Sequence, residues 1–344
     1  MEDSESRRLQ SDSLSVEVTT RCNSSCSHCF VRARWTRGES LSPDLVKTVV
    51  LEGYEAGYRN LHITGGEPLM WSGLQEILDC AFAMGYEKAF LNTNGTLLTA
   101  EVGGNLATYD SLAVSVSLQG PKRLHDLMRG TGSYERAVQG IHNALNAGLP
   151  VHIFTTVGKS LLPDLPRFAE EVFTTFPDIR RLDFIQLIRV PGDVFDVSAE
   201  VLSPDDFLRL VKMVALLNLY GLKTDILNNP LAVVASRVLN MPWLFPSRPL
   251  YGPGSIMVAA DLRITLAHST TDHLGTYEPG SLQRVLMSDE YHRAVSENLV
   301  TCGDCINSQL CRTEGMTRPS DRYRDMRPQV PYCKRVLAEA KSCG

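Results

Sequence analysis

The sequence lacks the long apolar segments that membrane insertion and secretion require. No stretch approaches the roughly 20 consecutive apolar residues of a membrane-spanning helix. The N-terminus, MEDSESRRLQ, also lacks the apolar core of a signal peptide. We therefore expect no membrane partner and a cytoplasmic location, with residues 1–13 forming a disordered N-terminus.

The chain also lacks an excess of positive charge. Its 34 Lys and Arg residues stand against 39 Asp and Glu, which gives a net charge of -5 over 344 residues. A protein that coats nucleic acid carries a basic surplus, so we expect no nucleic-acid partner. The apolar fraction of 43% and the aromatic fraction of 7% are typical of a globular chain.

Disulfide bonding is not expected, although the chain has nine cysteines. The number is odd, and no secretory signal precedes them. Seven cysteines instead fall into two groups, and a metal ion or an iron–sulfur cluster requires several thiolates that converge on one centre. The first group is Cys22, Cys26 and Cys29, and the second is Cys302, Cys305, Cys311 and Cys333.

Strand-like and helix-like segments alternate through the first half of the chain. The segment from Leu14 to Thr20 alternates in polarity and is β-branched, which predicts a strand that leads directly into Cys22. Ser42 followed by Pro43 predicts the start of a helix. The same reasoning predicts further strands at 61–64, 88–92, 112–117, 151–156 and 182–187, and helices at 43–54, 71–85, 97–107, 133–147, 164–175 and 204–219.

Strands that are separated by helices form parallel sheets, because each crossover returns the chain to the same end of the sheet. We therefore predict an α/β fold, a partial (β/α)6 TIM-like barrel at residues 14–190. Its loops should gather at the carboxyl edge of the strands, where such folds bind ligands. A connecting helical region should follow at 191–250, a small C-terminal iron–sulfur module with a hairpin near 255–266 should span 251–335, and a tail should span 336–344.

The spacing Cys22-x3-Cys26-x2-Cys29 supplies three thiolates to a four-iron cluster and leaves one iron with an open position. The amino and carboxylate groups of S-adenosylmethionine (SAM) can chelate that iron. A reduced cluster beside the sulfonium can cleave a C–S bond and release a 5′-deoxyadenosyl radical, which abstracts hydrogen from an unactivated carbon. A zinc ion is the alternative, but structural zinc needs four ligands and no fourth is obvious here.

These residues resemble the radical SAM superfamily. The motif Cys-Asn-Ser-Ser-Cys-Ser-His-Cys follows the first predicted strand, and Gly-Gly-Glu-Pro at 65–68 follows the second. In that family the Gly-Gly-Glu-Pro loop receives the methionine amino group of SAM, and glycine permits the close backbone approach that this requires. An aromatic residue near the adenine stands in the family where this chain has His28.

The resemblance continues along the next strands and implies further contacts with SAM. Family members use a serine and an arginine at the corresponding positions to hold the ribose and the carboxylate of SAM. Gln119 is a departure, because many relatives have aspartate there, so the neighbouring contacts can differ. The SAM-binding residues that the resemblance implies are His28, Gly65, Gly66, Glu67, Asn94, Ser117 and Arg129.

The second cysteine group resembles the SPASM or twitch extension of radical SAM enzymes. Such enzymes include peptide maturases, the maturation enzyme for pyrroloquinoline quinone, and haem-modifying relatives. Full SPASM domains hold two auxiliary clusters, but this chain has no cysteine from Tyr251 to His268, where relatives have them. We therefore expect one auxiliary [4Fe–4S] cluster, held by four thiolates. A structural zinc ion on the same four cysteines is the alternative.

The expected activity is hydrogen abstraction by the 5′-deoxyadenosyl radical, driven by a reductant such as flavodoxin or ferredoxin. The resemblance favours a ribosomally made peptide as substrate, to be oxidised, cross-linked or epimerised. Small molecules are alternatives: dehydrogenation or epimerisation of an aminosugar-type metabolite, or modification of a tetrapyrrole side chain. A non-catalytic, zinc-stabilised binding module is an alternative of another class.

Several other residues invite a functional interpretation. Cys80 lies in an apolar helical segment, and Cys343 lies in the tail, so neither is expected to donate hydrogen. His152 and Asp183 fall on predicted strands, where inward-facing side chains could meet substrate. A structural hydrogen bond is at least as good an explanation for them.

Overall fold

The computed structural model describes residues 13–29, 38–188, 196–227, 229–241, 254–266, 273–300, 306–307 and 332–342. In this part of the chain the strands form one sheet in the order β10-β9-β8-β1-β2-β3-β4-β5-β6-β7. The first five are β1 (Ser13–Glu17), β2 (Asn60–Thr64), β3 (Lys88–Thr93), β4 (Leu112–Ser117) and β5 (Val151–Val157). The others are β6 (Arg181–Gln186), β7 (Thr224–Ile226), β8 (Ile256–Val258), β9 (Arg263–Thr265) and β10 (Gly275–Thr276).

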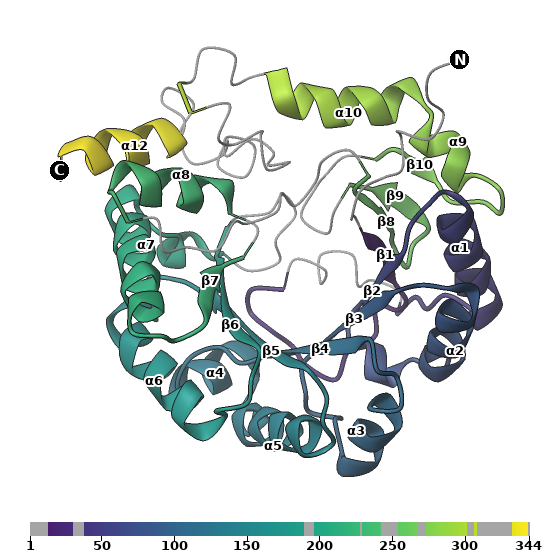
Figure 1. The fold of residues 1–344 in the computed structure, drawn as a ribbon, viewed down its shortest axis with the longest axis horizontal. Helices are drawn as coiled ribbons and strands as arrows, with labels where there is room; N and C mark the ends of the chain where they lie inside the picture. The colour runs from purple at the N-terminus through teal and green to yellow at the C-terminus, as the bar shows by residue number, and fades with distance from the viewer. Residues whose placement is uncertain are drawn as a thin grey trace.

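The predicted α/β fold is confirmed. Each strand from β1 to β7 pairs in parallel with the next, and β8 pairs in parallel with β1. Figure 1 shows the sheet curving as an open barrel, with helices on its outer side. The helices of this layer are α1 (Pro43–Glu55), α2 (Leu74–Met84), α3 (Ala100–Leu106), α5 (Ser133–Asn146), α6 (Leu165–Thr175) and α7 (Pro204–Leu219).

Capping residues explain where two of these helices begin. The Ser42 hydroxyl accepts a hydrogen bond from Leu45 N, and Pro43 occupies the first turn of α1. At α7, Ser203 and Asp206 form a capping box, again with proline at the first helical position. Each such cap contributes about 1 kcal/mol, so these sequence signals set the start of both helices.

The chain also has elements that the sequence reading did not predict. They include β7, which extends the parallel sheet beyond β6, and the helices α4 (Lys122–Arg129), α8 (Pro230–Val238) and α12 (Tyr332–Ser342). Helix α12 crosses residue 335, where we expected the C-terminal module to end, and it packs on α7 and α8. The predicted hairpin near 255–266 is present as the antiparallel pair of β8 and β9.

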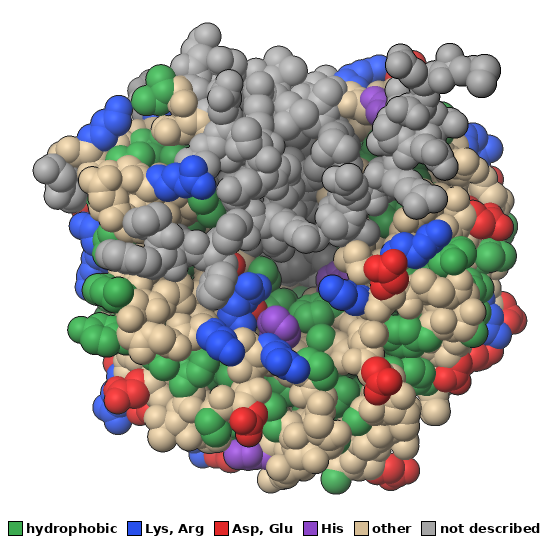
Figure 2. Space-filling model, in the orientation of Figure 1, with side chains coloured by type: hydrophobic (Ala, Val, Ile, Leu, Met, Phe, Trp, Pro, Cys, Tyr) green, Lys and Arg blue, Asp and Glu red, His purple; other side chains and the backbone are tan. Residues whose placement is uncertain are grey.

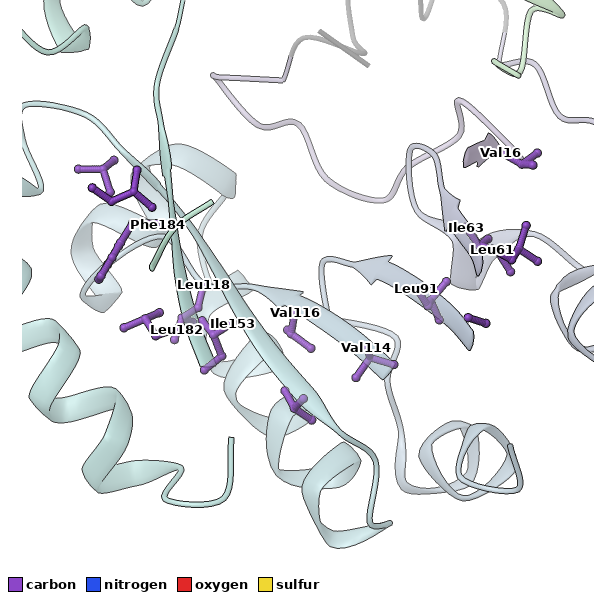
Figure 3. Packing of buried hydrophobic residues seen from close by; sticks show 14 of the residues in the cluster. Val16, Leu61, Ile63, Leu91, Val114, Val116, Leu118, Ile153, Leu182 and Phe184 are labelled. Carbon is purple, nitrogen blue, oxygen red and sulfur yellow. The ribbon is translucent and has the colours of Figure 1, made fainter. Parts of the chain in front are cut away.

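The two faces of the barrel differ in character. Figure 3 shows apolar side chains of neighbouring strands, among them Leu91, Val114, Ile153 and Leu182, packed together beneath the helices. Because side chains alternate along a strand, the neighbouring residues face the barrel interior. These interior residues include the polar side chains of Asn92, Ser115, His152 and Asp183 and the aromatic rings of Phe90 and Phe154. The fold therefore places polar side chains where a substrate could be enclosed.

Glu52 of α1 connects the barrel to the C-terminal part of the chain. Its carboxylate accepts hydrogen bonds from Tyr277 Oη at 2.7 Å, Gly280 N at 2.6 Å and Leu282 N at 3.0 Å. Residue Leu282 begins α9 (Leu282–Leu286), and α10 (Asp289–Val300) follows it. A carboxylate at a helix start is favourable, because the first amides of a helix lack partners within it.

The face of the molecule shown in Figure 2 has no dominant sign of charge. On the face shown in Figure 2 acidic and basic side chains are interspersed, apart from a group of Lys and Arg side chains around a histidine over β5 and β6. Among the described residues no helix is both long enough and apolar enough to cross a membrane.

Candidate active site

The loops after β1 and β2 are hydrogen-bonded to each other at the carboxyl edge of the sheet. Gly66 N donates to Thr19 O at 2.6 Å, and Glu67 N donates to Arg21 O at 2.8 Å. A Cβ atom at Gly66 would overlap the Arg21 carbonyl oxygen, so the loops approach this closely only because position 66 has no side chain. The Gly-Gly-Glu-Pro loop thus lies directly against the chain that enters the first cysteine group.

The first cysteine group, from Cys22 to Cys29, is held by the loop after β3. Asn94 Nδ2 donates to Asn23 Oδ1 at 2.8 Å and lies 3.8 Å from Cys22 Sγ. Asn23 Nδ2 in turn donates to Thr96 Oγ1 at 2.8 Å. Residues about seventy positions apart in sequence are therefore joined, which fixes the first thiol of the group relative to β3.

Helix α4 holds the same loop from another side. Ser27 N donates to Met128 O, in the last turn of α4, at 2.9 Å. Within the loop, Cys29 N donates to Cys26 O at 3.3 Å. The loop after β2, the loop after β3 and helix α4 therefore all hold the cysteine loop in place.

Glu67 joins the loops after β2 and β3. Its side chain has no exposed surface, and its oxygens accept from Leu69 N at 3.1 Å, Thr93 Oγ1 at 2.7 Å and Asn94 N at 2.7 Å. Burial raises the pKa of Glu67, and these hydrogen bonds together with the nearby Arg129 oppose that rise. The carboxylate thus acts within the protein as a brace between two loops of the site.

The thiols of the group are close enough to influence one another. Cys26 is buried, and Cys22 and Cys29 are half-buried. Burial raises the pKa of Cys22 to about 11, and Glu67, Cys26 and Cys29 add to the rise while the Ser24 amide opposes it. A metal centre would displace the thiol protons, because thiolates are the ligands. No three Cys, His, Asp or Glu side chains of the described ranges are arranged to hold a single metal ion. A four-iron cluster, by contrast, takes one thiolate at each of three separate irons.

Two buried polar atoms of the site lack partners among the described residues. They are Nδ1 of His28, between the second and third cysteines, and Nε of Arg129, at the end of α4. Burial, with Arg129 and His125 nearby, lowers the pKa of His28 to about 3, so its ring is neutral. Buried polar atoms ordinarily have partners. An acceptor for Arg129 and a polar partner for His28 are therefore what a ligand would bring, and SAM carries both kinds of group.

Further residues shape the loop between β4 and α4. His125 Nδ1 accepts from Gln119 N at 3.0 Å, and Gln119 Oε1 accepts from Thr156 N at 2.6 Å. The Asp126 carboxylate accepts from Gly132 N, Ser133 Oγ and Tyr134 N. Gln119, which departs from the family pattern, therefore ties this loop to β5.

Six of the seven implied SAM-binding residues lie on loops or strand ends at the carboxyl edge of β1 to β4, and the seventh, Arg129, is the last residue of α4. Ser117 is the last residue of β4 and is half-buried beside Phe154 of β5. Of the second cysteine group only Cys333, in α12, is described, and it is half-buried. Cys302, Cys305, Cys311, Tyr251 and His268 lie outside the described residues.

The barrel interior contains an ionic cluster that the sequence reading found only in part. His152 Nδ1 lies 3.3 Å from Asp183 Oδ2, and Asp183 Oδ1 lies 2.6 Å from Arg181 Nε. Arg181 Nη1 lies 3.9 Å from Asp225 Oδ2. Burial raises the pKa of Asp225 to about 6, although Arg181 opposes the rise. Asp225 was missed because a three-residue strand such as β7 shows no readable periodicity. Arg181 was missed because the predicted strand began at residue 182, one residue after the start of β6.

The residue registers place this cluster beside the expected SAM site. Ser117 pairs with Phe154, Phe154 with Asp183, and Asp183 with Asp225. In-register residues of parallel strands point to the same side, so these four side chains form one layer across the interior.

An open barrel of parallel strands, with three thiols and a Gly-Gly-Glu-Pro loop at its carboxyl edge, defines a class of SAM-dependent iron–sulfur enzymes. Residues 16–172 match the radical SAM superfamily.

Curated relatives share this part of the chain. An AdoMet-dependent heme synthase of Oleidesulfovibrio alaskensis is 30% identical over 196 residues, 56% of this chain and 49% of that protein. Mycofactocin maturase MftC of Mycolicibacterium smegmatis is 34% identical over 160 residues, 45% of this chain and 40% of that protein. Fe-coproporphyrin III synthase of Methanosarcina barkeri is 32% identical over 151 residues, 43% and 38% respectively. The matched segments thus span half or less of each of these relatives.

Solved structures share the fold over more of the chain. The enzyme anSMEcpe with bound AdoMet and Kp18Cys peptide superposes with a TM-score of 0.74 at 17% identity, covering 96% of both chains. Streptococcus suis SuiB bound to its precursor peptide SuiA superposes with a TM-score of 0.66 at 16% identity, covering 83% of this chain and 66% of SuiB. At such identities the likeness extends to the fold alone.

Proposed function

We propose that this enzyme reductively cleaves SAM to a 5′-deoxyadenosyl radical and uses it to abstract hydrogen from a C–H bond of its substrate. The observation that carries the proposal is the pair of unpartnered buried atoms, His28 Nδ1 and Arg129 Nε, beside the three-cysteine loop. Such atoms are costly to bury without a ligand that pairs with them.

Different residues of the chain would bind the cluster and SAM. Cys22, Cys26 and Cys29 would hold a [4Fe–4S] cluster, which when bound supplies the electron that breaks the C–S bond of SAM. Gly65 and Gly66 would let the backbone approach the methionine amino group, with Glu67 bracing that loop. Toward the rest of SAM, the residues that would bind are His28, Asn94, Ser117 and Arg129.

Replacement of the three cysteines tests this assignment directly. We expect the Cys22→Ala, Cys26→Ala, Cys29→Ala triple variant, purified anaerobically, to lose one cluster and all SAM cleavage. The readouts are iron content and 5′-deoxyadenosine formation with dithionite as reductant. Continued formation of 5′-deoxyadenosine by the triple variant would refute the proposal. A colourless, iron-free wild-type protein with bound zinc would instead support a non-catalytic binding module.

We propose a ribosomally made peptide as the substrate, to be oxidised, cross-linked or epimerised. The fold likeness to anSMEcpe and SuiB, both solved with peptides, and the sequence similarity to mycofactocin maturase support this class. A deuterated candidate peptide should transfer deuterium to 5′-deoxyadenosine, which mass spectrometry detects. Absence of transfer from every precursor peptide encoded beside the gene would count against a peptide substrate.

A tetrapyrrole is the second candidate substrate, because two similar relatives are named heme synthase and Fe-coproporphyrin III synthase. The same isotope experiment with deuterated Fe-coproporphyrin III discriminates between the two classes. An aminosugar-type metabolite would be identified in the same way.

We further propose one auxiliary [4Fe–4S] cluster on Cys302, Cys305, Cys311 and Cys333, and a flavodoxin or ferredoxin as the electron donor. A closed cluster has no open iron for substrate, so its role would be to accept or relay an electron. The low-potential chemistry suits a reducing compartment such as the cytoplasm.

A further inference from the structure

Helix α4 has one buried side and one exposed side, and its last turn is hydrogen-bonded to the cysteine loop. Its inner side carries Leu124 and His125, which are 5% and 1% exposed, and Arg129, whose Nε is buried in the site. Its outer side carries Lys122, Arg123 and Leu127, which we name the α4 face. Leu127 is 74% exposed, far more than a leucine of the core. One short helix therefore contacts both the SAM site and the surrounding water.

The α4 face is also linked directly to the cysteine loop. Ser27 lies between two of the three cysteines, and its amide donates to Met128 O in the last turn of α4. Residue Met128 follows the exposed Leu127 in sequence. A protein bound to the α4 face would therefore sit one helix away from the loop that carries the cluster ligands.

The charges of α4 leave one cation available to a partner. Lys122 is paired with Glu135 of α5. The Asp126 carboxylate is turned to the backbone and side chains of residues 132–134, so it does not neutralise the outer face. Arg123 has no ion-pair partner within the described part of the chain. Positions 123 and 127 are four residues apart and so lie on the same side of the helix.

An arginine beside an exposed leucine suits a small, transient contact. Arg is enriched at protein interfaces, and electron-transfer contacts are among the smallest, below about 1,200 Å². The chain as a whole carries a net charge of -5 and so repels an acidic partner at long range. At physiological ionic strength charges are screened beyond about 8 Å, so the local charge decides where such a partner docks.

We propose that the α4 face is the docking surface for an acidic one-electron carrier protein of the flavodoxin type. The inference rests on the proposed function, since it requires a cluster on the first cysteine group. One electron leaves the reduced carrier and is gained by the cluster, and no bond is formed or broken in this transfer.

The test compares two reductants on the anaerobic holoenzyme. Arg123→Glu should lower the rate of 5′-deoxyadenosine formation with fully reduced flavodoxin at least tenfold at low ionic strength. With dithionite, which needs no docking surface, its rate should equal that of the wild type. Arg123→Lys should restore most of the flavodoxin-supported rate, because it keeps the charge. Arg180→Glu makes the same charge change at an exposed position before β6, at the opposite edge of the sheet, and should behave as wild type with both reductants.

The outcomes separate the docking surface from the activity itself. Equal flavodoxin-supported rates in Arg123→Glu and wild type would overturn the docking proposal, as would an equal loss in Arg180→Glu. If flavodoxin fails to support the wild-type enzyme while dithionite succeeds, the carrier class is wrong. If the wild type cleaves no SAM even with dithionite, the proposed function fails, and the docking proposal fails with it.

Discussion

Glu67 serves the site without lying at its surface. The sequence suggests that this carboxylate meets the amino group of SAM, but its oxygens accept from two backbone amides and a threonine hydroxyl. A hydrogen bond of this kind contributes roughly 0.5–1.5 kcal/mol, and more where the carboxyl is ionised. The Glu67 carboxyl group therefore holds the loops after β2 and β3 in one arrangement, and SAM would bind to loops that are already in that arrangement.

Replacing Glu67 should accordingly weaken SAM binding through the loops. We expect Glu67→Ala to bind SAM at least tenfold more weakly with near-normal iron content, as measured by anaerobic titration of the holoenzyme and by iron analysis. Glu67→Gln keeps the side-chain volume but places its NH2 group against a backbone N–H, and both groups are donors. We therefore expect a loss of SAM affinity that is smaller than in Glu67→Ala. An unchanged SAM affinity in Glu67→Ala would show that the brace does not matter for binding.

His28 offers a second prediction at this scale. Its Nδ1 is buried without a partner among the described residues, so we infer a polar contact with the ligand. His28→Phe keeps an aromatic ring and removes the nitrogen, and SAM affinity should fall about fivefold, the loss expected for one hydrogen bond of about 1 kcal/mol. His142→Phe, which alters a histidine packed on Phe176 of the outer layer, is the matched control. Equal affinities in His28→Phe and wild type would mean that the ring only packs.

Sequence reading identified which residues gather at this edge but not what each one contacts. The motifs indicated His28, Gly66, Glu67 and Asn94 as site residues, and all lie at the carboxyl edge. The contacts of Glu67 and Asn94, however, join residues 26 to 72 positions apart. Such contacts depend on how two loops that are distant in sequence pack against each other, and a short sequence pattern does not predict this packing.

At the scale of elements, periodicity worked where segments are long. Strand β4 and helix α7 have the predicted bounds, and β2, β3, β5 and β6 differ by one residue at one end or at each. The missed elements are short or atypical. Helix α4 has eight residues and begins at Pro121 with no side-chain cap, and β7 has three residues whose stability comes from pairing with β6. Such short elements form because of tertiary contacts, so their own sequence gives little indication of a helix or a strand.

The ionic cluster on β5 to β7 gives a prediction for pH. Burial raises the pKa of Asp225 from 3.8 to about 6, with Asp183 adding to the rise and Arg181 opposing it. The folded state thus holds this proton more tightly than the unfolded state. Stability is lost as the pH rises from about 4 toward 6, where the unfolded carboxyl has already ionised.

Asp225→Asn removes this titration. Relative to wild type, the variant should gain about 1 kcal/mol of stability between about pH 5 and pH 7. Anaerobic thermal unfolding gives the midpoint temperatures of the variant and the wild type at each pH. The difference between the two midpoints should be larger at the higher pH. Asp178→Asn, at an exposed aspartate shortly before β6, is the control. The charged groups that face Asp225 are Asp183, Arg181 and, through Asp183, His152. A midpoint difference independent of pH would mean that Arg181 holds Asp225 ionised throughout.

At the scale of the molecule, buried tyrosines fix the C-terminal part to the barrel. Tyr58 Oη donates to Gly254 O at 2.6 Å, and Gly254 N donates to Tyr291 Oη at 2.7 Å. Tyr332 of α12 is 1% exposed, and its hydroxyl lies 2.9 Å from Leu202 O. The contacts of Tyr58 with Gly254 and of Tyr332 with Leu202 bridge 196 and 130 positions in the sequence, so the two parts of the chain are fixed to each other.

Tyr332 also bears on the proposed auxiliary cluster. Its hydroxyl lies 3.4 Å from Nε2 of Gln186, the last residue of β6, and Cys333 is the next residue in the chain. The one described cysteine of the second group is thus held close to the carboxyl edge of the barrel. An electron released at that edge would have a short path to a cluster on Cys333.

The number of clusters follows from the positions of the thiols. On the proposed assignment the first group would hold one open cluster, and Cys302, Cys305, Cys311 and Cys333 would hold one closed cluster. No cysteine lies between Cys80 and Cys302 to hold a third. Iron should therefore be about eight per chain after anaerobic reconstitution. The Cys302→Ala, Cys305→Ala variant should lose about half of this iron and retain SAM cleavage with dithionite, because the first group is intact. Conversion of substrate to an oxidised product should fall steeply, since the electron of the substrate radical loses its acceptor.

About twelve iron atoms per chain would require a further cluster with a non-thiol ligand such as His268. Zinc in stoichiometric amount would make the C-terminal module structural.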